Sequence, residues 1–168
     1  MRHARAFTLV EVLIVVVLLG VLAAIVVPSM SRGRTTARES ALAADLSLLR
    51  RFMLIYKSQH MEIAPGYPGG DSTATPTSDA FRDQATLQTN SAGQTAARGT
   101  AGFPYGPYIS RVPANPFNNR ETVLMIENGQ AFPAAADNEY GWICKPQTGE
   151  IRPGNIGVDD RGTAYYAY

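Results

Sequence analysis

A long apolar segment near the N-terminus most constrains what this chain can fold into. Residues 12–27 read VLIVVVLLGVLAAIVV and include no polar side chain. Extending the segment back to Phe7 gives 21 residues, interrupted only by Thr8 and Glu11. As a helix rising about 1.5 Å per residue, it would span roughly 31 Å, enough to cross the hydrocarbon core of a bilayer. Because lipid offers the backbone no hydrogen-bond partner, we predict a transmembrane helix despite the many β-branched valines.

Glu11 is the residue that makes this segment unusual. A secretory signal peptide has a shorter apolar region and a small-residue cleavage site after it, whereas Pro28, Ser29 and Met30 follow the run here. A plain membrane anchor has no use for a carboxylate, which costs about 2.5–3.5 kcal/mol near the bilayer centre and indicates a function. Alternatively, Glu11 lies close enough to the interface to reach water, since it precedes the uninterrupted run. The residues alone leave both interpretations open.

The residues around Glu11 also carry a family resemblance. Residues 6–11, AFTLVE, follow a short basic leader and precede the apolar run and Pro28. This arrangement resembles the N-terminal signature of type IV pilins and of type II secretion pseudopilins. In that family a membrane aspartyl protease, the prepilin peptidase, cuts just before the Phe and methylates the new N-terminus. The resemblance implies cleavage between Ala6 and Phe7 and methylation of Phe7, slowed because the family usually has glycine in place of Ala6.

The resemblance gives Glu11 a role in assembly, within a motif that Pro28 closes. Cleavage would create an ammonium at Phe7, which the Glu11 carboxylate of a neighbouring subunit would neutralise inside an apolar helix bundle. Such a pair favours one axial register over others. Pro28 removes a backbone donor and predicts a kink or weak point at the end of the apolar run.

The family's partners and location follow from the same resemblance. It implies a homopolymer with other pilin-like subunits, and contacts with the prepilin peptidase, an inner-membrane assembly platform and secretion cargo. It also implies a single pass through a bacterial inner membrane, with the leader in the cytoplasm and the globular part in the periplasm.

Beyond the apolar run, the spacing of apolar residues predicts an amphipathic helix of about 25 residues that ends before Pro65. One stripe recurs at intervals of three and four: Leu42, Leu46, Leu49, Phe52, Met53 and Tyr56. We interpret it as the face on which the globular part packs. Residues 66–103 are rich in Gly, Ser, Thr, Pro and Ala, which predicts an exposed loop. A short helix is predicted within it, from Asp79 to about Leu87 with Ser78 as N-cap.

The C-terminal part predicts a small antiparallel sheet. Residues 121–127 and 140–145 read as strands, and the second continues through a turn at Gly149 into residues 150–152 as a hairpin. Cys144 alternates with its neighbours on this strand, so we expect a buried thiol that behaves as a small hydrophobe.

This half resembles the major pseudopilin of type II secretion in residues 105–109 (YGPYI), 112–116 (VPANP) and 141–143 (GWI). Major pseudopilins bind calcium near the C-terminus. The resemblance therefore makes Asp159 and Asp160 candidate calcium ligands, because carboxylate oxygens suit that ion. Two adjacent aspartates are also typical of a solvated turn.

Composition excludes several other classes of protein. The 15 Lys and Arg residues against 14 Asp and Glu are scattered in both signs, so we expect no nucleic-acid binding. A single cysteine excludes an internal disulfide and a Cys-based zinc site. His3 and His60 are interpreted as surface imidazoles, and neither belongs to a catalytic motif. We therefore predict that the chain is not an enzyme.

The sequence thus predicts an α+β fold, in which a long N-terminal helix packs on a small antiparallel β-sheet. Its expected parts are a leader (1–6), a transmembrane helix (7–29) and a globular pilin-like domain (30–168). The predicted function is that of a structural subunit of a pseudopilus filament driving protein export by type II secretion. The alternatives are a type IV pilin for adhesion, motility or DNA uptake, and a membrane-tethered binding module that never polymerises.

Overall fold

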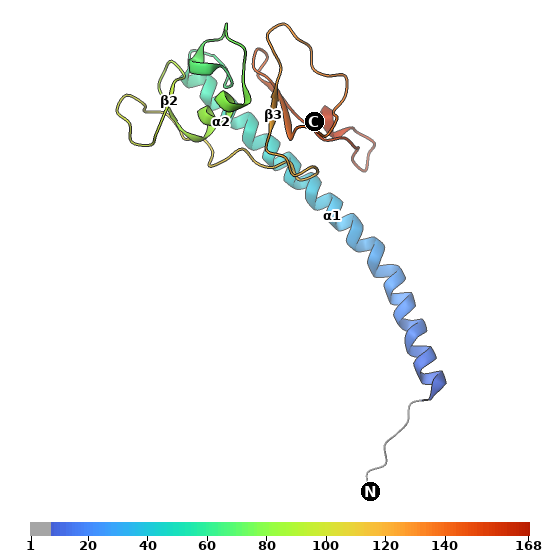
Figure 1. Cartoon of the computed structure of the whole chain (residues 1–168). Helices are drawn as coiled ribbons and strands as arrows, with labels where there is room; N and C mark the ends of the chain where they lie inside the picture. Colours follow the sequence, from blue (N-terminus) through green and yellow to red (C-terminus); the bar gives the residue numbers. More distant parts are fainter. Residues whose placement is uncertain (1–7) are drawn as a thin grey trace. The chain divides into compact units, whose positions relative to one another are not determined.

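A computed structural model describes residues 8–168, apart from the side chains of residues 25–32. It combines one long helix with several short elements, and Figure 1 traces them along the chain. The elements are α1 (Leu9–Gln59), η1 (Pro68–Gly70), α2 (Ser78–Thr86), β1 (Gln88–Thr89), β2 (Thr95–Ala96), β3 (Val123–Met125), β4 (Trp142–Lys145), β5 (Glu150–Pro153) and η2 (Tyr165–Ala167). The chain divides into two compact units, Met1–Arg38 and Glu39–Tyr168, so that α1 belongs to both.

The helix α1 covers both segments that the sequence predicted as helical. Its 51 residues include Pro28, and the helical assignment continues through that residue. The predicted kink or weak point at Pro28 stays a prediction. Among the residues whose side chains are described, no helical segment is both long enough and apolar enough to cross a membrane. The predicted transmembrane segment, residues 7–29, reaches beyond those residues at both ends.

The core of the second unit forms around the predicted stripe of α1. All six of its side chains are at most 2% exposed. They pack with residues from α2, from the sheet and from the C-terminal segment, among them Phe81, Val123, Trp142, Ile151 and Tyr165. At about 1.5–3 kcal/mol for each fully buried large apolar side chain, this stripe is a main source of the unit's stability. The predicted packing face is therefore confirmed.

The predicted α+β class is confirmed, but the larger sheet is mixed rather than antiparallel. Its order is β3-β4-β5. The strands β4 and β5 form the predicted antiparallel hairpin, and Gly149 at its turn has a φ of +71° that favours glycine. The strand β3, however, pairs with β4 in parallel. The long connection between β3 and β4 allows this pairing, whereas a tight turn would have forced an antiparallel one.

Residues 66–103 are more ordered than the predicted loop. The short helix is present as α2, but its N-cap is Thr77, whose hydroxyl accepts a hydrogen bond from the Ala80 amide at 3.1 Å. The prediction of Ser78 was wrong by one residue, because both hydroxyl side chains suit that position. The strands β1 and β2 then pair as a short antiparallel hairpin. Two-residue strands leave no alternating pattern that a sequence could reveal.

Candidate functional site

Glu11 closes the first turn of α1 in a reciprocal arrangement with Thr8. The Glu11 amide donates to the Thr8 hydroxyl at 3.2 Å, and the Thr8 amide donates to the Glu11 carboxylate at 3.4 Å. This is a capping box, which satisfies backbone donors that have no partner within the helix. The negative charge of Glu11 also lies where the helix dipole favours it. Threonine three residues before a glutamate, ahead of an apolar run, was the sequence signal for this feature, and our sequence analysis missed it.

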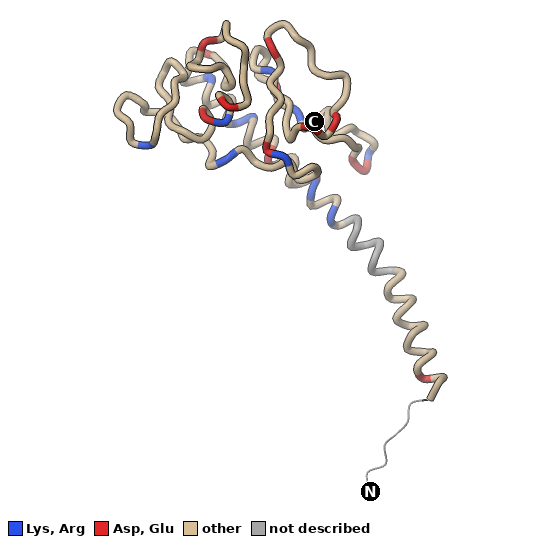
Figure 2. Tube along the Cα trace, viewed as in Figure 1, with Lys and Arg blue, Asp and Glu red and all other residues tan. Residues whose placement is uncertain are grey.

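The carboxylate of Glu11 has no other charged residue near it in the first part of α1. Glu11 is the only charged residue in residues 8–24, a stretch of the helix that is otherwise drawn in tan in Figure 2. Glu11 and the large apolar side chains that follow it are exposed. The capping box therefore leaves the carboxylate accessible to a cation outside the chain while it holds the side chain at the helix start. Ala6 and Phe7, the predicted cleavage site, lie outside the described residues, as does the side chain of Pro28.

Three tyrosines fasten the C-terminal segment to the rest of the second unit. The hydroxyl of Tyr165 donates to Glu39 in α1 at 2.8 Å, and that of Tyr166 donates to the carbonyl of Pro133 at 2.7 Å. The hydroxyl of Tyr168 donates to Asp159 at 2.9 Å. Burial and the neighbouring carboxylate of Asp159 raise the pKa of Tyr168 to about 12, so this hydroxyl stays protonated and keeps its role as a donor.

Asp159 organises the loop in which the calcium site was predicted. One carboxylate oxygen accepts from the amides of Arg161 at 2.9 Å and Thr163 at 2.7 Å, while the other accepts from Tyr168. Although desolvation opposes ionisation, these hydrogen bonds outweigh it and lower the pKa of Asp159. Calcium takes six to eight oxygen ligands. In the part of the chain that is described, no group of three or more acidic, His or Cys side chains is placed to hold a metal.

Both carboxylate oxygens of Asp159 already accept hydrogen bonds within the chain. An ion at this position would have to compete with the hydroxyl of Tyr168 and recruit further oxygens from the backbone or from water. Calcium binding by these two aspartates stays a prediction.

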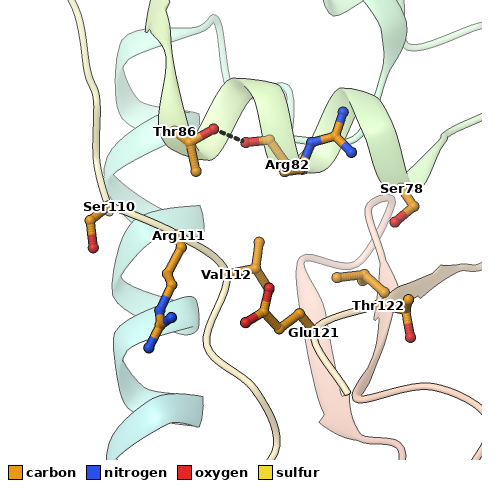
Figure 3. A pocket seen from close by; sticks show the side chains of 9 residues that line it. Ser78, Arg82, Thr86, Ser110, Arg111, Val112, Glu121 and Thr122 are labelled. Carbon is orange, nitrogen blue, oxygen red and sulfur yellow. Dashed lines mark hydrogen bonds between the residues drawn. The ribbon is translucent and has the colours of Figure 1, made fainter. Parts of the chain in front are cut away.

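A hollow of about 410 Å³ lies between α2, the segment 110–112 and the start of β3. Figure 3 shows Arg82 and Thr86 on the helix above it, with Arg111 and Glu121 on the segments below. Arg82 is engaged by Asp79 at 2.9 Å and Asp83 at 3.0 Å on its own helix. The residues that line the hollow offer surface charges and hydroxyls rather than a paired nucleophile and base. We assign this hollow no chemistry.

His60 is buried, so its interpretation as a surface imidazole was wrong. It is 1% exposed and its ring stacks on that of Tyr56, with centroids 3.7 Å apart. Nδ1 donates to the Tyr56 carbonyl at 2.7 Å, which leaves Nε2 to accept from the Thr89 hydroxyl at 2.9 Å. Burial lowers the pKa of His60, so the neutral ring is the stable form. This ring connects the end of α1 to β1, which is a structural role. His3 lies outside the described residues.

Comparison with known proteins decides the family. Residues 1–27 match the family described as "Prokaryotic N-terminal methylation motif". The chain is 29% identical to a type II secretion system core protein G of Aeromonas hydrophila in an alignment of length 150 that covers 83% of this chain and 88% of that protein. It is 30% identical to the core protein G of Vibrio cholerae over 120 residues, covering 71% of this chain and 69% of that protein. The chain belongs to the type II secretion system core protein G family.

Membership of the core protein G family makes the chain a major pseudopilin by descent and confirms the resemblance seen in the sequence. A type IV wide pilus major component of Thermus thermophilus is 35% identical, but over only 57 residues, which are 34% of this chain. No solved structure matches the chain significantly. The similarity to core protein G covers 71–83% of the chain, whereas the similarity to the pilus component covers 34% of it.

Proposed function

We propose that this chain is a structural, non-enzymatic subunit of a pseudopilus that drives protein export by type II secretion. The observation that carries the proposal is its membership of the core protein G family over most of its length. The N-terminal motif supports processing of the leader between Ala6 and Phe7 and methylation of Phe7. The proposed partners are other pilin-like subunits, the prepilin peptidase, an inner-membrane assembly platform and secreted cargo.

The subunit is held in the bacterial inner membrane by residues 7–29, with the globular part in the periplasm. Assembly then requires that the apolar segments leave lipid and pack against one another. Lipid is as apolar as these side chains, so burial alone gives little preference for one arrangement. A charge pair in an apolar bundle does give a preference, because an unpaired charge there is costly.

We assign that pairing to Glu11 and the methylated ammonium of Phe7 in a neighbouring subunit. The capping box supports the assignment because it holds the carboxylate at the start of α1 before assembly. A carboxylate with a fixed position loses less side-chain entropy when it pairs. Pro28, at the end of the apolar segment, is proposed to belong to the same assembly region.

Three substitutions separate pairing from capping. Glu11→Gln keeps a side chain that suits a capping box but removes the charge. Glu11→Ala removes both, and Thr8→Ala removes the cap while keeping the charge. Filaments from cells expressing each full-length variant are sheared, sedimented and quantified, and membrane insertion and leader cleavage are scored on the same samples.

Pairing predicts that Glu11→Gln and Glu11→Ala insert and are cleaved but lose filaments equally, while Thr8→Ala retains most of them. Wild-type filament yield from Glu11→Gln would instead show that Glu11 acts through the cap alone. A wild-type chain that is inserted in the membrane but gives no filaments would favour a tethered module that never polymerises.

A type IV pilin is the second candidate, supported by the similarity of 57 residues of the chain to the pilus component of Thermus thermophilus. The two functions differ in where the filament is found. When its subunit is expressed at the normal level, a pseudopilus stays within the cell envelope, and its loss blocks protein export. A pilus projects from the cell, and its loss affects adhesion, motility or DNA uptake. Deleting the gene and assaying secreted proteins distinguishes them.

A further inference from the structure

The outward face of α1 in the second unit is apolar although the unit leaves it uncovered. Leu48, Leu54 and Ile55 lie on the side of the helix opposite the buried stripe, and Leu54 is 70% exposed. Arg51, also exposed, lies between them on the same face. We call these four residues the helix ridge. Single exposed apolar residues are ordinary, but a continuous row of them indicates a contact surface.

A second uncovered apolar surface lies on different elements of the same unit. It is a hollow of about 210 Å³ between the loop that joins β3 to β4 and the segment that follows β5. Ile156 at its edge is 58% exposed. We call it the alanine hollow, and it is lined by Ala134, Ala135, Ala136, Asn155, Ile156, Gly157, Ala164 and Tyr166. An apolar cavity of about 150 Å³ holds a benzene-sized group, so one leucine side chain fits this space.

The two surfaces carry opposite charges at their edges. In the described part of the chain, the recorded ion pairs engage Lys57, Arg82 and Arg152 but leave Arg51 of the helix ridge unpaired. Asp137 and Glu139 follow directly after the alanines of the hollow and are both exposed. Asp137 accepts a hydrogen bond from the amide of Glu139 at 2.9 Å, which keeps the two acidic residues in one turn. Opposite charges of this kind fix the register of a contact and disfavour other partners.

The charges on the two surfaces favour a contact between the ridge of one copy and the hollow of another. A two-fold dimer that placed ridge against ridge would bring Arg51 against its own copy, which like-charge repulsion disfavours. A contact of ridge with hollow that is not reciprocated instead leaves a free ridge on one copy and a free hollow on the other. Contacts of this heterologous kind repeat without closing and produce filaments.

We propose that the helix ridge of one copy docks into the alanine hollow of the next. Leu54 is the apolar anchor, and Arg51 faces Asp137 and Glu139 of the neighbouring copy. This inference rests on the proposed function, since it names the surfaces through which the globular parts of a filament meet. It is independent of Glu11, which lies in the other compact unit.

Disulfide crosslinking in assembled filaments tests the contact. The full-length Leu54→Cys, Ala135→Cys double variant is expressed, its filaments are oxidised, and the products are separated without reductant. Docking predicts a ladder of covalent multimers, because each copy then carries both partners. A mixture of the two single variants should stop at covalent dimers. The native Cys144 is fully buried and does not contribute.

The matched control is the Leu87→Cys, Ala135→Cys variant, since Leu87 is an exposed leucine at the end of α2 rather than on the ridge. It should give no ladder. Filaments that assemble from the Leu54 variant without crosslinking would overturn the inference and leave the proposed function standing. If the wild-type chain forms no filaments in the same cells, the proposed function fails instead.

A charge exchange provides a second readout if the cysteine variants assemble poorly. Arg51→Glu should lower filament yield at least roughly fivefold, because the charge reversal removes an exposed ion pair and adds like-charge repulsion with Asp137 and Glu139. Adding Asp137→Arg and Glu139→Arg to the same chain should restore the yield. Arg98→Glu, an exposed arginine in the loop after β2, should leave it unchanged. A combined variant that assembles less well than Arg51→Glu alone would contradict the pairing.

Discussion

The two compact units use apolar residues of the same helix in opposite ways. In residues 9–22, every large apolar side chain is at least half exposed. In the second unit, the stripe from Leu42 to Tyr56 is fully buried by the chain's own α2, sheet and C-terminal segment. The difference is that only the second unit supplies its own partner for the helix. The first therefore needs lipid or other subunits, which is the physical basis for a membrane precursor that assembles.

Removing the first unit is the most drastic way to test this comparison. A fragment of residues 34–168 keeps the whole stripe and its partners, so we expect it to fold cooperatively. It lacks the segment proposed to insert and to pair, so we also expect a monomer that neither enters membranes nor forms filaments. Circular dichroism on heating and analytical ultracentrifugation measure these properties. An aggregated or unfolded fragment would show that the second unit depends on the first.

Two substitutions on one helix compare its buried and exposed faces. Phe52→Ala removes a ring that contacts Tyr56, Phe81 and Tyr108, and should cost about 3–5 kcal/mol of unfolding free energy. Leu54→Ala, two residues away on the exposed face, should change it by less than about 0.5 kcal/mol. Urea denaturation of residues 34–168 measures both values. Equal losses would mean that Leu54 is covered within the subunit, which would also weaken the proposed ridge.

Much of this fold was predictable because its main signals are long and periodic. Six residues of one stripe define a helix face, and a turn with Gly149 defines the hairpin of β4 and β5. The parallel pairing of β3 was not predictable, since the sequence does not say which edge of β4 a distant strand will join. The burial of His60 was missed because it depends on two contacts that have no sequence pattern. Its ring stacks on Tyr56, and it accepts a hydrogen bond from Thr89, which lies in the two-residue strand β1.

Protonation of His60 should weaken the second unit as the pH falls. Burial lowers its pKa below the ordinary value of about 6.5, so the unfolded chain takes up the proton first. Its contribution to stability is therefore complete above about pH 6.5 and is lost as the pH falls toward the lowered pKa. Three tyrosine rings face His60, those of Tyr56, Tyr105 and Tyr108. Burial raises the pKa of Tyr56 and of Tyr108, so these two hydroxyls stay protonated over that range. Melting temperatures of residues 34–168 between pH 7.5 and 5 should fall less in His60→Gln, and an identical slope would exclude His60 as the cause.

The smallest expected effects concern the loop at Asp159. Tyr168→Phe removes one hydrogen bond and should lower the melting temperature by less than Phe52→Ala does. Millimolar calcium should raise the melting temperature if the loop binds it, because a ligand of the folded state stabilises by mass action. Magnesium should substitute poorly, and the rise should vanish in the Asp159→Ala, Asp160→Ala variant. If calcium left the melting temperature unchanged, the role of Asp159 would be limited to its hydrogen bonds within the turn and with Tyr168.

The candidate assembly site was only partly predictable. Glu11 stood out because a lone carboxylate in an apolar run is costly, and the resemblance supplied its partner at Phe7. The capping box was equally readable from Thr8 and Glu11 but was overlooked. The alanine hollow had no sequence signal, because its lining comes from two loops that meet only in the folded unit.

The central claim, that this chain is processed as a subunit of a filament, is tested most directly by the N-terminus of the mature protein. Mass spectrometry of the intact chain from its native membrane, with sequencing of the N-terminal peptide, gives both its start and its modification. We predict a mature chain that begins at Phe7 and carries one N-methyl group. A mature chain that begins at Met1, or at a residue beyond Pro28, would contradict it.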